Sequence, residues 1–256
     1  MSATEPAAVD ERTEDGFFGG RLRLIQPRHG HRVGTDAALL TAAARSLLTP
    51  GDHVADLGSG VGAVGLSLAL SGAGRALLVE IDPATADLAR ENARRNGVEA
   101  AVLTGDVGAV GRPGLGEAER ETFDLVVANP PFDAVGRFRA SPQADKARAH
   151  AAGEGLLEVW TRAAARLLKP GGHAVMIHRP EALGELTAAF EGRFGDLRLK
   201  PVQARADGPA IRLIVAGRKG RRGALTLSAP FVLHGPDGAA TAEAFAVQRG
   251  QATLPL

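Results

Sequence analysis

Short apolar runs alternate with longer stretches of helical periodicity through the middle of this 256-residue chain. An apolar run bounded by glycine, proline or charged residues is typical of a buried strand. Such runs predict strands over residues 53–57, 76–81, 100–103, 123–128 and 173–178. Apolar positions at helical spacing predict helices over residues 37–48, 66–70, 83–96, 156–168 and 181–194. This alternation indicates a parallel sheet with helices on both faces.

The last part of the chain breaks the alternation. Two more strand-like runs, residues 196–205 and 210–218, follow one another without a long helix between them. They predict an antiparallel hairpin at the C-terminal edge of the sheet, because antiparallel neighbours need only a short connection. The expected fold class is therefore α/β, with a doubly wound, mostly parallel, seven-stranded sheet of the Rossmann-like type.

The N-terminal region has a different character. Residues 1–16 are polar and acidic, and we expect a disordered tail there. Residues 17–256 are expected to form a single domain. Within it, residues 17–50 form an N-terminal extension with a short strand, a basic loop punctuated by glycine, and a helix. Residues 108–121 are rich in glycine and charge, which predicts a surface loop.

Composition excludes several classes of site. The chain has no cysteine, which rules out disulfides, thiolate metal ligands and a cysteine nucleophile. Apart from His29-x-His31, the seven histidines show no metal-ligand spacing, so no metal is predicted. No apolar stretch of about 18 uncharged residues is present, and the polar start does not resemble a signal peptide. We therefore expect a cytoplasmic protein with no membrane partner. A net charge of +1 means that any surface for nucleic acid must be local.

The strand expected over residues 123–128 ends in an unusual way, at Asn129-Pro130-Pro131-Phe132. Proline cannot continue a strand ladder, so the strand must stop here. The residue before each proline is restricted to extended geometry. The four residues, which we call the hook, hold an amide and an aromatic ring in fixed relation at the carboxyl end of a strand. Open α/β sheets bind their ligands at that edge.

A glycine loop, Gly60-x-Gly62-x-x-Gly65, lies after the first expected core strand and before a helix. Glu80 follows 20 residues after Gly60, where a ribose-binding carboxylate is expected. This loop by itself fits either a nicotinamide cofactor or S-adenosylmethionine, because both require close approach of the backbone.

Two further acids favour S-adenosylmethionine. Asp56 lies at the end of the first core strand, two residues before Gly58. A carboxylate there suits the cationic, amino-bearing end of S-adenosylmethionine and would repel a pyrophosphate. Asp106, at the end of the third strand, can accept a hydrogen bond from the adenine amino group. Acids on three successive strand ends therefore predict a site for this cofactor.

Four motifs of the chain resemble those of class I S-adenosylmethionine-dependent methyltransferases that act on amino groups. They are Asp56-Leu57-Gly58-Ser59-Gly60-Val61-Gly62, Val79-Glu80-Ile81-Asp82-Pro83, Gly105-Asp106 and the hook. Flanking segments are similar to the bacterial tRNA1(Val) adenine-37 N6-methyltransferases. These segments are Gly34-Thr35-Asp36-Ala37-Ala38-Leu39-Leu40, Arg139-Ala140-Ser141-Pro142 and Ile211-Arg212-Leu213-Ile214-Val215-Ala216-Gly217-Arg218-Lys219-Gly220. The likeness runs from about residue 17 to the C-terminus.

This resemblance implies S-adenosylmethionine as cofactor and tRNA as partner. The motif positions and strand ends together give a cofactor-binding set: Thr35, Asp36, Asp56, Gly58, Gly60, Gly62, Glu80, Ile81, Asp106, Val107 and Asn129. That group of enzymes often has tyrosine at the fourth hook position. This chain has Phe132, so the ring is kept but no phenol can act.

The hook residues are the expected catalytic set. Methyl transfer from a sulfonium is an in-line displacement that depends on positioning and electrostatics. The Asn129 side-chain oxygen and the Pro130 carbonyl can accept the two hydrogens of an exocyclic amino group. Pro131 offers no competing N–H donor. Phe132 can stack on a base.

Three basic runs are candidates for contact with RNA phosphates. The RNA-binding set expected from them is Arg28, His29, Arg32, Arg137, Arg139, Lys219 and Arg221. The family resemblance implies methylation of adenine N6 in tRNA, at position 37 of tRNA1(Val), and the basic runs favour an RNA substrate. The hook also fits N-methylation of protein glutamine N5, rRNA guanine N2 or DNA adenine N6.

The sequence disfavours two other classes of protein. A nicotinamide dehydrogenase would need a catalytic arrangement such as Tyr-x-x-x-Lys, and the chain has no tyrosine. A non-catalytic RNA-binding module would not need the intact acids and amide at the strand ends.

Overall fold

The structure is a computed structural model that describes residues 12–29, 32–116, 119–132 and 155–256. Its large sheet orders the strands β10-β8-β9-β7-β6-β3-β4-β5, and β11 also pairs with β8. The main strands are β3 (His53–Leu57), β4 (Arg75–Glu80), β5 (Ala101–Thr104), β6 (Phe123–Ala128), β7 (Leu168–His178), β8 (Phe194–Gln203) and β9 (Ala210–Lys219). Strands β5, β4, β3, β6 and β7 are parallel neighbours. The expected α/β fold with a mostly parallel sheet is confirmed.

The antiparallel hairpin is present, but it is not at the outer edge. Strand β9 lies between β7 and β8 and is antiparallel to both. Two short strands, β10 (Thr226–Leu227) and β11 (Phe231–Val232), then pair in parallel with β8. The C-terminal segment thus covers the edge of β8, and the sheet has nine strands where the sequence predicts seven.

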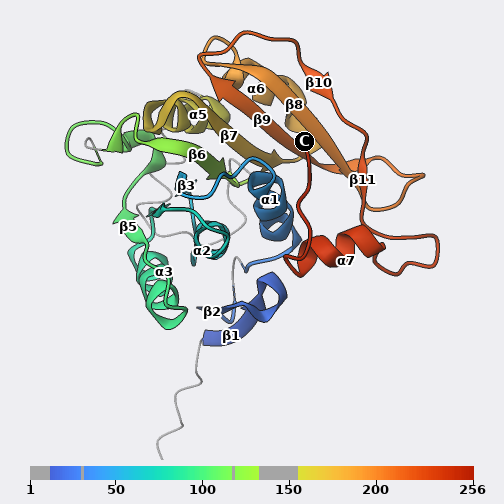
Figure 1. The fold of residues 1–256 in the computed structure, drawn as a ribbon, viewed down its shortest axis with the longest axis horizontal. Helices are drawn as coiled ribbons and strands as arrows, with labels where there is room; N and C mark the ends of the chain where they lie inside the picture. Colours follow the sequence, from blue (N-terminus) through green and yellow to red (C-terminus); the bar gives the residue numbers. More distant parts are fainter. Residues whose placement is uncertain (1–11, 30–31, 117–118, 133–154) are drawn as a thin grey trace, which may run out of the picture.

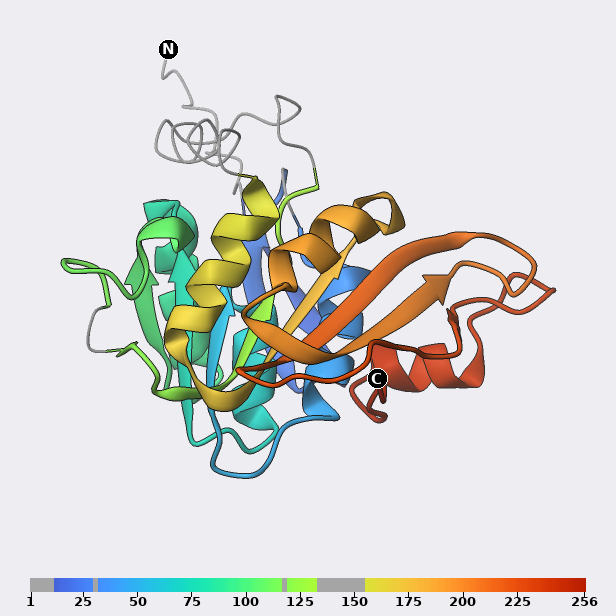
Figure 2. The same ribbon diagram turned by 90° about the horizontal axis from the view of Figure 1, so that it is seen from above.

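Helices cover both faces of this sheet, as Figures 1 and 2 show. They are α1 (Thr35–Arg45), α2 (Ala63–Leu70), α3 (Pro83–Arg95), α5 (Leu156–Leu167), α6 (Leu183–Phe190) and α7 (Ala242–Gln248), with short 3-10 turns η1 (Phe18–Gly20), η2 (Val107–Ala109) and η4 (Pro180–Ala182). One buried cluster includes Val54 with residues of α1, α2, α3 and α7. The other includes the next residue, Ala55, with α5 and α6. Successive strand residues point to opposite faces, so each strand serves both cores.

The N-terminus corrects one expectation. Strands β1 (Arg12–Phe17) and β2 (Leu22–Pro27) form an antiparallel hairpin outside the main sheet. Residues 12–16 therefore belong to this hairpin and not to the tail expected over residues 1–16; residues 1–11 lie outside the described residues. Every second side chain of β1 is exposed, so backbone pairing rather than hydrophobic periodicity defines this strand.

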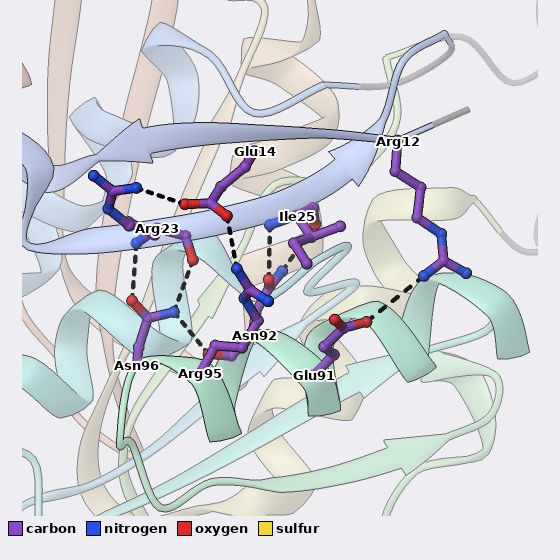
Figure 3. Close-up of polar contacts among 8 residues, drawn as sticks. All are labelled: Arg12, Glu14, Arg23, Ile25, Glu91, Asn92, Arg95 and Asn96. Atoms are coloured by element: carbon purple, nitrogen blue, oxygen red, sulfur yellow. Dashed lines mark hydrogen bonds and ion pairs between the residues drawn. The ribbon is translucent and has the colours of Figure 1, made fainter. Parts of the chain in front are cut away.

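Two asparagines of α3 dock the hairpin (Figure 3). Asn92 accepts a hydrogen bond from the Ile25 backbone N–H at 2.8 Å and donates to the Ile25 carbonyl at 3.0 Å. Asn96 makes the same pair of bonds to the Arg23 backbone, at 2.8 and 2.7 Å. Asn92 also donates to the Val61 carbonyl at 3.0 Å. Because Val61 lies inside the glycine loop, Asn92 joins that loop to the hairpin.

Two further segments differ from the sequence prediction. Residues 242–248 form α7, for which no helix was predicted, and this helix packs against α1 through buried Ala244 and Val247. The predicted surface loop over residues 108–121 is partly internal, because Val110 is fully buried. In the described part of the chain, no helix has the length and apolar character needed to cross a bilayer.

Candidate active site at the carboxyl edge of the sheet

Asp56 is the most deeply buried acid of the candidate site. It lies in β3, is only 3% exposed, and accepts a hydrogen bond from the Gly65 backbone N–H at 2.9 Å. Burial raises the pKa of Asp56 to about 7; the Gly65 bond opposes this rise and the negative charge of Glu80 adds to it. A buried carboxylate of this kind is stabilised in its charged form when a cation binds beside it.

The glycine loop between β3 and α2 has two sides. Gly58 has φ +65°, and a Cβ there would lie 2.4 Å from a ring carbon of Trp160. Gly60 has φ +56°, and a Cβ there would meet nothing within 4 Å. Gly58 thus packs closely against α5, whereas Gly60 faces open space in a backbone conformation that disfavours side chains. The loop leaves room for a ligand to approach its backbone.

Glu80, at the end of β4, holds this loop in place. Its carboxylate accepts hydrogen bonds from the backbone N–H of Gly60 and of Asp82, both at 2.9 Å. Burial is the main cause that raises the pKa of Glu80, and these backbone bonds oppose it. A carboxylate has about four lone-pair positions, so it can still accept bonds from ribose hydroxyls. Its role in pinning the glycine loop was not predicted from the sequence.

The remaining acid of the cofactor side, Asp106, follows β5. It accepts a hydrogen bond from the Gly108 backbone N–H at 2.8 Å and so caps the turn η2. Strands β3, β4 and β5 are adjacent and parallel, so Asp56, Glu80 and Asp106 lie along one edge of the sheet. Of the other predicted cofactor residues, Val107 is buried and Ile81 is half-buried beside these acids, while Thr35 is exposed at the start of α1.

The hook begins directly after β6, between β3 and β7 in the sheet. Pro130 is buried, Pro131 is exposed, and Asn129 and Phe132 are half-buried. No hydrogen bond joins the Asn129 side chain to another residue in the described ranges. Its amide is therefore available to a ligand at the same edge as the acids.

Three side chains from distant elements surround Phe132. The His178 ring, at the end of β7, meets it edge-on, with 5.0 Å between ring centroids and an interplanar angle of 84°. The guanidinium carbon of Arg212, from β9, lies 4.9 Å from the Phe132 ring centroid. Arg179 lies 5.8 Å from the same centroid and donates a hydrogen bond to the Phe132 carbonyl. Phe132 is thus held in place by β7 and β9.

Asp36 binds one of the side chains that surround Phe132. Both of its carboxylate oxygens accept from the Arg212 Nε–H, each at 2.9 Å. The sequence assigns Asp36 to the cofactor, whereas its carboxylate in the structure binds Arg212 beside the hook. Arg212 lies in the segment of residues 211–220 that resembles the tRNA methyltransferases, and this resemblance is the one sequence signal that could have identified it. His178 and Arg179 carried no recognised signal in the sequence.

His178 is 5% exposed, and its Nδ1 has no hydrogen-bond partner among the described residues. Burial is the main cause that lowers its pKa, and the positive charge of Arg179 lowers it further. Both effects favour the uncharged form of the ring, which contacts Phe132 as an aromatic group.

The predicted RNA-binding residues separate into two groups. Arg28, His29 and Arg32 are exposed between β2 and α1, where Arg32 pairs with Asp15 at 2.8 Å. Lys219 lies at the opposite end of β9, paired with Glu121 at 2.8 Å, and Arg221 follows it. The antiparallel direction of β9 carries these two residues away from the hook, so one surface including all of them is not formed.

Arg137 and Arg139 lie outside the described residues. Within the ranges that the structure describes, no cluster of histidine and acidic side chains could hold a metal ion.

Comparison with known proteins gives relatives of several activities. A 4-amino-L-phenylalanine/4-methylamino-L-phenylalanine methyltransferase from Streptomyces pristinaespiralis is 36% identical over 157 residues, covering 58% of this chain and 51% of that protein. A tRNA1(Val) (adenine(37)-N6)-methyltransferase from Aeromonas hydrophila is 33% identical over 174 residues, covering 63% and 65%. A ribosomal protein L11 methyltransferase from Symbiobacterium thermophilum is 38% identical over 107 residues, covering 41% and 33%. The chain thus spans between a third and two thirds of the length of these relatives.

Among solved structures, a predicted O-methyltransferase from Agrobacterium tumefaciens matches with a TM-score of 0.70 and 29% identity, covering 86% of this chain and 99% of that chain. An N2-methyltransferase of 16S rRNA from Thermus thermophilus, in complex with AdoMet and guanosine, has a TM-score of 0.57 at 22% identity, covering 81% and 50%. The latter likeness shows the fold alone.

A family model also matches more than half of the chain. The model of the methyltransferase small domain covers residues 32–200, from just before α1 to a point within β8. This span includes the glycine loop, the three acids and the hook. The chain therefore belongs to the methyltransferase small domain family, with S-adenosylmethionine as its cofactor.

Proposed function

We propose that this protein is an N-methyltransferase that methylates the N6 amino group of adenine in tRNA, at position 37 of tRNA1(Val). The observation that carries the proposal is the hook at the carboxyl end of β6, beside β3 and its buried acid. The Asn129 amide, which has no described partner, and the Phe132 ring, which is held in place, lie next to the glycine loop and the three acids of the cofactor site. We call that part of the site the cofactor edge.

In this proposal the three acids would bind different parts of the cofactor. Asp56 would hold the cationic amino-bearing end, Glu80 would accept hydrogen bonds from the ribose hydroxyls, and Asp106 would accept one from the adenine amino group. The glycine loop admits the ligand to the backbone at Gly60, where a Cβ would meet only open space. When bound, S-adenosylmethionine supplies an electrophilic methyl group on a sulfonium.

The hook residues prepare the nucleophile. An exocyclic amino nitrogen is a weak nucleophile, because its lone pair is delocalised into the aromatic ring. The Asn129 side-chain oxygen and the Pro130 carbonyl accept its two hydrogens, which favours a pyramidal nitrogen and offsets the growing positive charge. Phe132 stacks on the base, an interaction worth about 1–3 kcal/mol. One proton leaves the methylated nitrogen to solvent, since the nitrogen is acidic once it is cationic.

Two of the three relatives described above support an aromatic amine as the acceptor, whereas the third is a ribosomal protein L11 methyltransferase. The Aeromonas relative methylates an adenine amino group in tRNA, and the Streptomyces relative acts on the amino group of an aminophenyl ring. Both acceptors place the reacting nitrogen on a planar ring that can stack on Phe132. Of these two acceptors, RNA is favoured by the exposed basic residues between β2 and α1.

The test is methylation of total tRNA from a strain that lacks this protein. We expect transfer of one methyl group from S-adenosylmethionine and N6-methyladenosine on mass spectrometry of the nucleosides. The Asn129→Ala variant is the control for contaminating activity. If tRNA is not methylated while a protein glutamine, rRNA, DNA or 4-amino-L-phenylalanine is, the proposed acceptor is wrong.

A further inference from the structure

Arg212 lies beside the Phe132 ring of the hook and is bound by an acid from another element. Its guanidinium carbon lies 4.9 Å from the Phe132 ring centroid, while its Nε–H is bound by both oxygens of Asp36. Its Nη1 donates to the carbonyl of Ile211 at 2.7 Å. No described residue accepts from its Nη2, and the side chain remains 28% exposed. The guanidinium is therefore oriented by two neighbours with donors left over.

We infer that Arg212 is a specificity-determining residue that binds an anionic group of the acceptor while the amino group of that acceptor enters the hook. A guanidinium on an aromatic ring keeps its in-plane N–H donors for other partners. Those donors form a fork that matches phosphate and carboxylate oxygens. The inference rests on the proposed function and adds to it the charge of the acceptor.

The role of Asp36 follows from this geometry. A pair of this kind, with side chains 28% and 22% exposed, contributes little to stability, because partial desolvation offsets the attraction. Its effect here is to fix the orientation of the Arg212 plane across Phe132. Asp36 is therefore a positioning residue, which acts through Arg212 and does not itself contact the acceptor.

The anion can come from two sources with the same chemistry. In RNA it is a phosphodiester next to the target base. In an aromatic amino acid it is the α-carboxylate. Either places a negative charge a few bonds from a planar aromatic amine. A neutral acceptor, such as the side-chain amide of a protein glutamine, would leave the free donors of Arg212 unused.

The experiment compares acceptors with and without an anion near the aromatic amine. The first pair is adenosine and a uridine-adenosine-uridine trinucleotide with a 5′-phosphate. The second pair is 4-(2-aminoethyl)aniline and 4-amino-L-phenylalanine, which differ only in the α-carboxylate. For each pair, kcat/KM is measured for the unaltered protein and for Arg212→Gln, Arg212→Lys and Asp36→Asn. Arg193→Gln is the matched control, since Arg193 pairs with Glu158 at similar exposure, 33% and 32%, away from the hook.

We expect the unaltered protein to prefer the anionic member of one pair. Arg212→Gln should reduce that preference by about 10- to 100-fold, as for loss of a hydrogen bond between charged groups. Arg212→Lys should recover part of it, because the charge remains and the fork is lost. Asp36→Asn should reduce it less than Arg212→Gln, and Arg193→Gln should leave it unchanged. Circular dichroism and the thermal unfolding midpoint report whether each variant is folded.

The outcomes separate the two proposals. A preference for the trinucleotide that disappears in Arg212→Gln supports both. A preference seen only for 4-amino-L-phenylalanine, and lost in Arg212→Gln, overturns RNA as the acceptor while the role of Arg212 stands. An equal preference in Arg212→Gln and the unaltered protein overturns the role of Arg212. If neither pair is methylated, the inference is also overturned.

Discussion

Two parts of this site are built in opposite ways: the cofactor edge, and the group around the hook formed by Asn129, Asp36, Phe132 and Arg212, which we call the acceptor edge. On the cofactor edge, Asp56 and Glu80 are nearly fully buried and accept hydrogen bonds from backbone N–H groups that are at most 20 residues away in the chain. On the acceptor edge, Asp36, Phe132 and Arg212 are partly exposed. Arg212 contacts both of the others, and 176 residues of sequence separate it from Asp36. The first is held by main chain, and the second by side chains.

This difference matches the ligands that the two edges would hold. A cofactor is the same in every turnover, so a rigid loop with fixed acids suits it. An acceptor varies among relatives that methylate tRNA, ribosomal protein or an amino acid. Side chains contributed by separate helices and strands can be substituted one at a time, without a change in the backbone. We therefore expect substitutions on the two edges to separate cofactor binding from turnover.

The largest effect is expected at Asn129, on the acceptor edge. Asn129→Ala should lower kcat by about 10²- to 10³-fold, because it removes an acceptor that acts on the developing charge. The affinity for S-adenosylmethionine, measured by calorimetry, should stay within a few-fold. Equal losses of turnover and affinity would mean that the hook only supports the fold, and the contrast between the edges would not hold.

On the cofactor edge, Asp56→Asn should weaken S-adenosylmethionine binding by about 10- to 100-fold, since it removes a charged partner. In the unaltered protein the affinity should rise from pH 6 to pH 8, because binding of the cation requires ionised Asp56 and its pKa in the free protein is about 7. The Asn variant should lack this dependence. The same pH slope in both proteins would assign the titration to another group.

Asp56 also predicts a pH dependence of stability. Its pKa in the folded protein, about 7, lies above the ordinary value of 3.8, so the folded state holds the proton more tightly. The free energy of unfolding should therefore fall as pH rises from about 4 to 7. Asp56→Asn removes this loss, so its stability relative to the unaltered protein should improve with pH. Urea unfolding at pH 5 and pH 8 measures the difference, and a shift in the opposite direction would contradict the raised pKa.

A smaller effect should separate Asn92 from Asn96 (Figure 3), which dock the same hairpin. Asn92 is fully buried and also bonds to Val61 in the glycine loop. Asn92→Ala should cost about 1–3 kcal/mol of unfolding free energy and weaken cofactor binding. Asn96→Ala, at a half-buried position with no bond to the loop, should cost less and leave cofactor affinity unchanged. Equal effects on affinity would show that the bond to Val61 does not support the loop.

The smallest effect is expected from single charges on the surface. Arg28→Glu should reduce the salt dependence of tRNA binding by about one unit of the log–log slope, as for the loss of one phosphate contact. Arg221→Glu, beyond the far end of β9, should leave the slope unchanged. Filter binding between low and moderate salt measures both. If Arg221→Glu lowered the slope and Arg28→Glu did not, the RNA would bind at the amino end of the parallel strands.

Much of the cofactor edge could be predicted from local sequence. Apolar strand runs end at Asp56, Glu80 and Asp106, and in a parallel sheet such ends lie at one edge whatever the details of packing. The glycine pattern and the two prolines of the hook act within a few residues through allowed backbone geometry. These features depend on neighbours in the chain, so a linear pattern can reveal them.

Other features depend on which elements meet, and only the tertiary structure decides that. Strand β9 runs antiparallel between β7 and β8, which brings Arg212 to Phe132 and carries Lys219 to the opposite end. The hairpin of residues 12–27 is defined by backbone pairing and by the side chains of α3, not by its own periodicity. Sequence by itself therefore determined the fold class, the acids and the hook. The partners of the hook came from long-range packing, because contacts across 176 residues leave no local period in the chain.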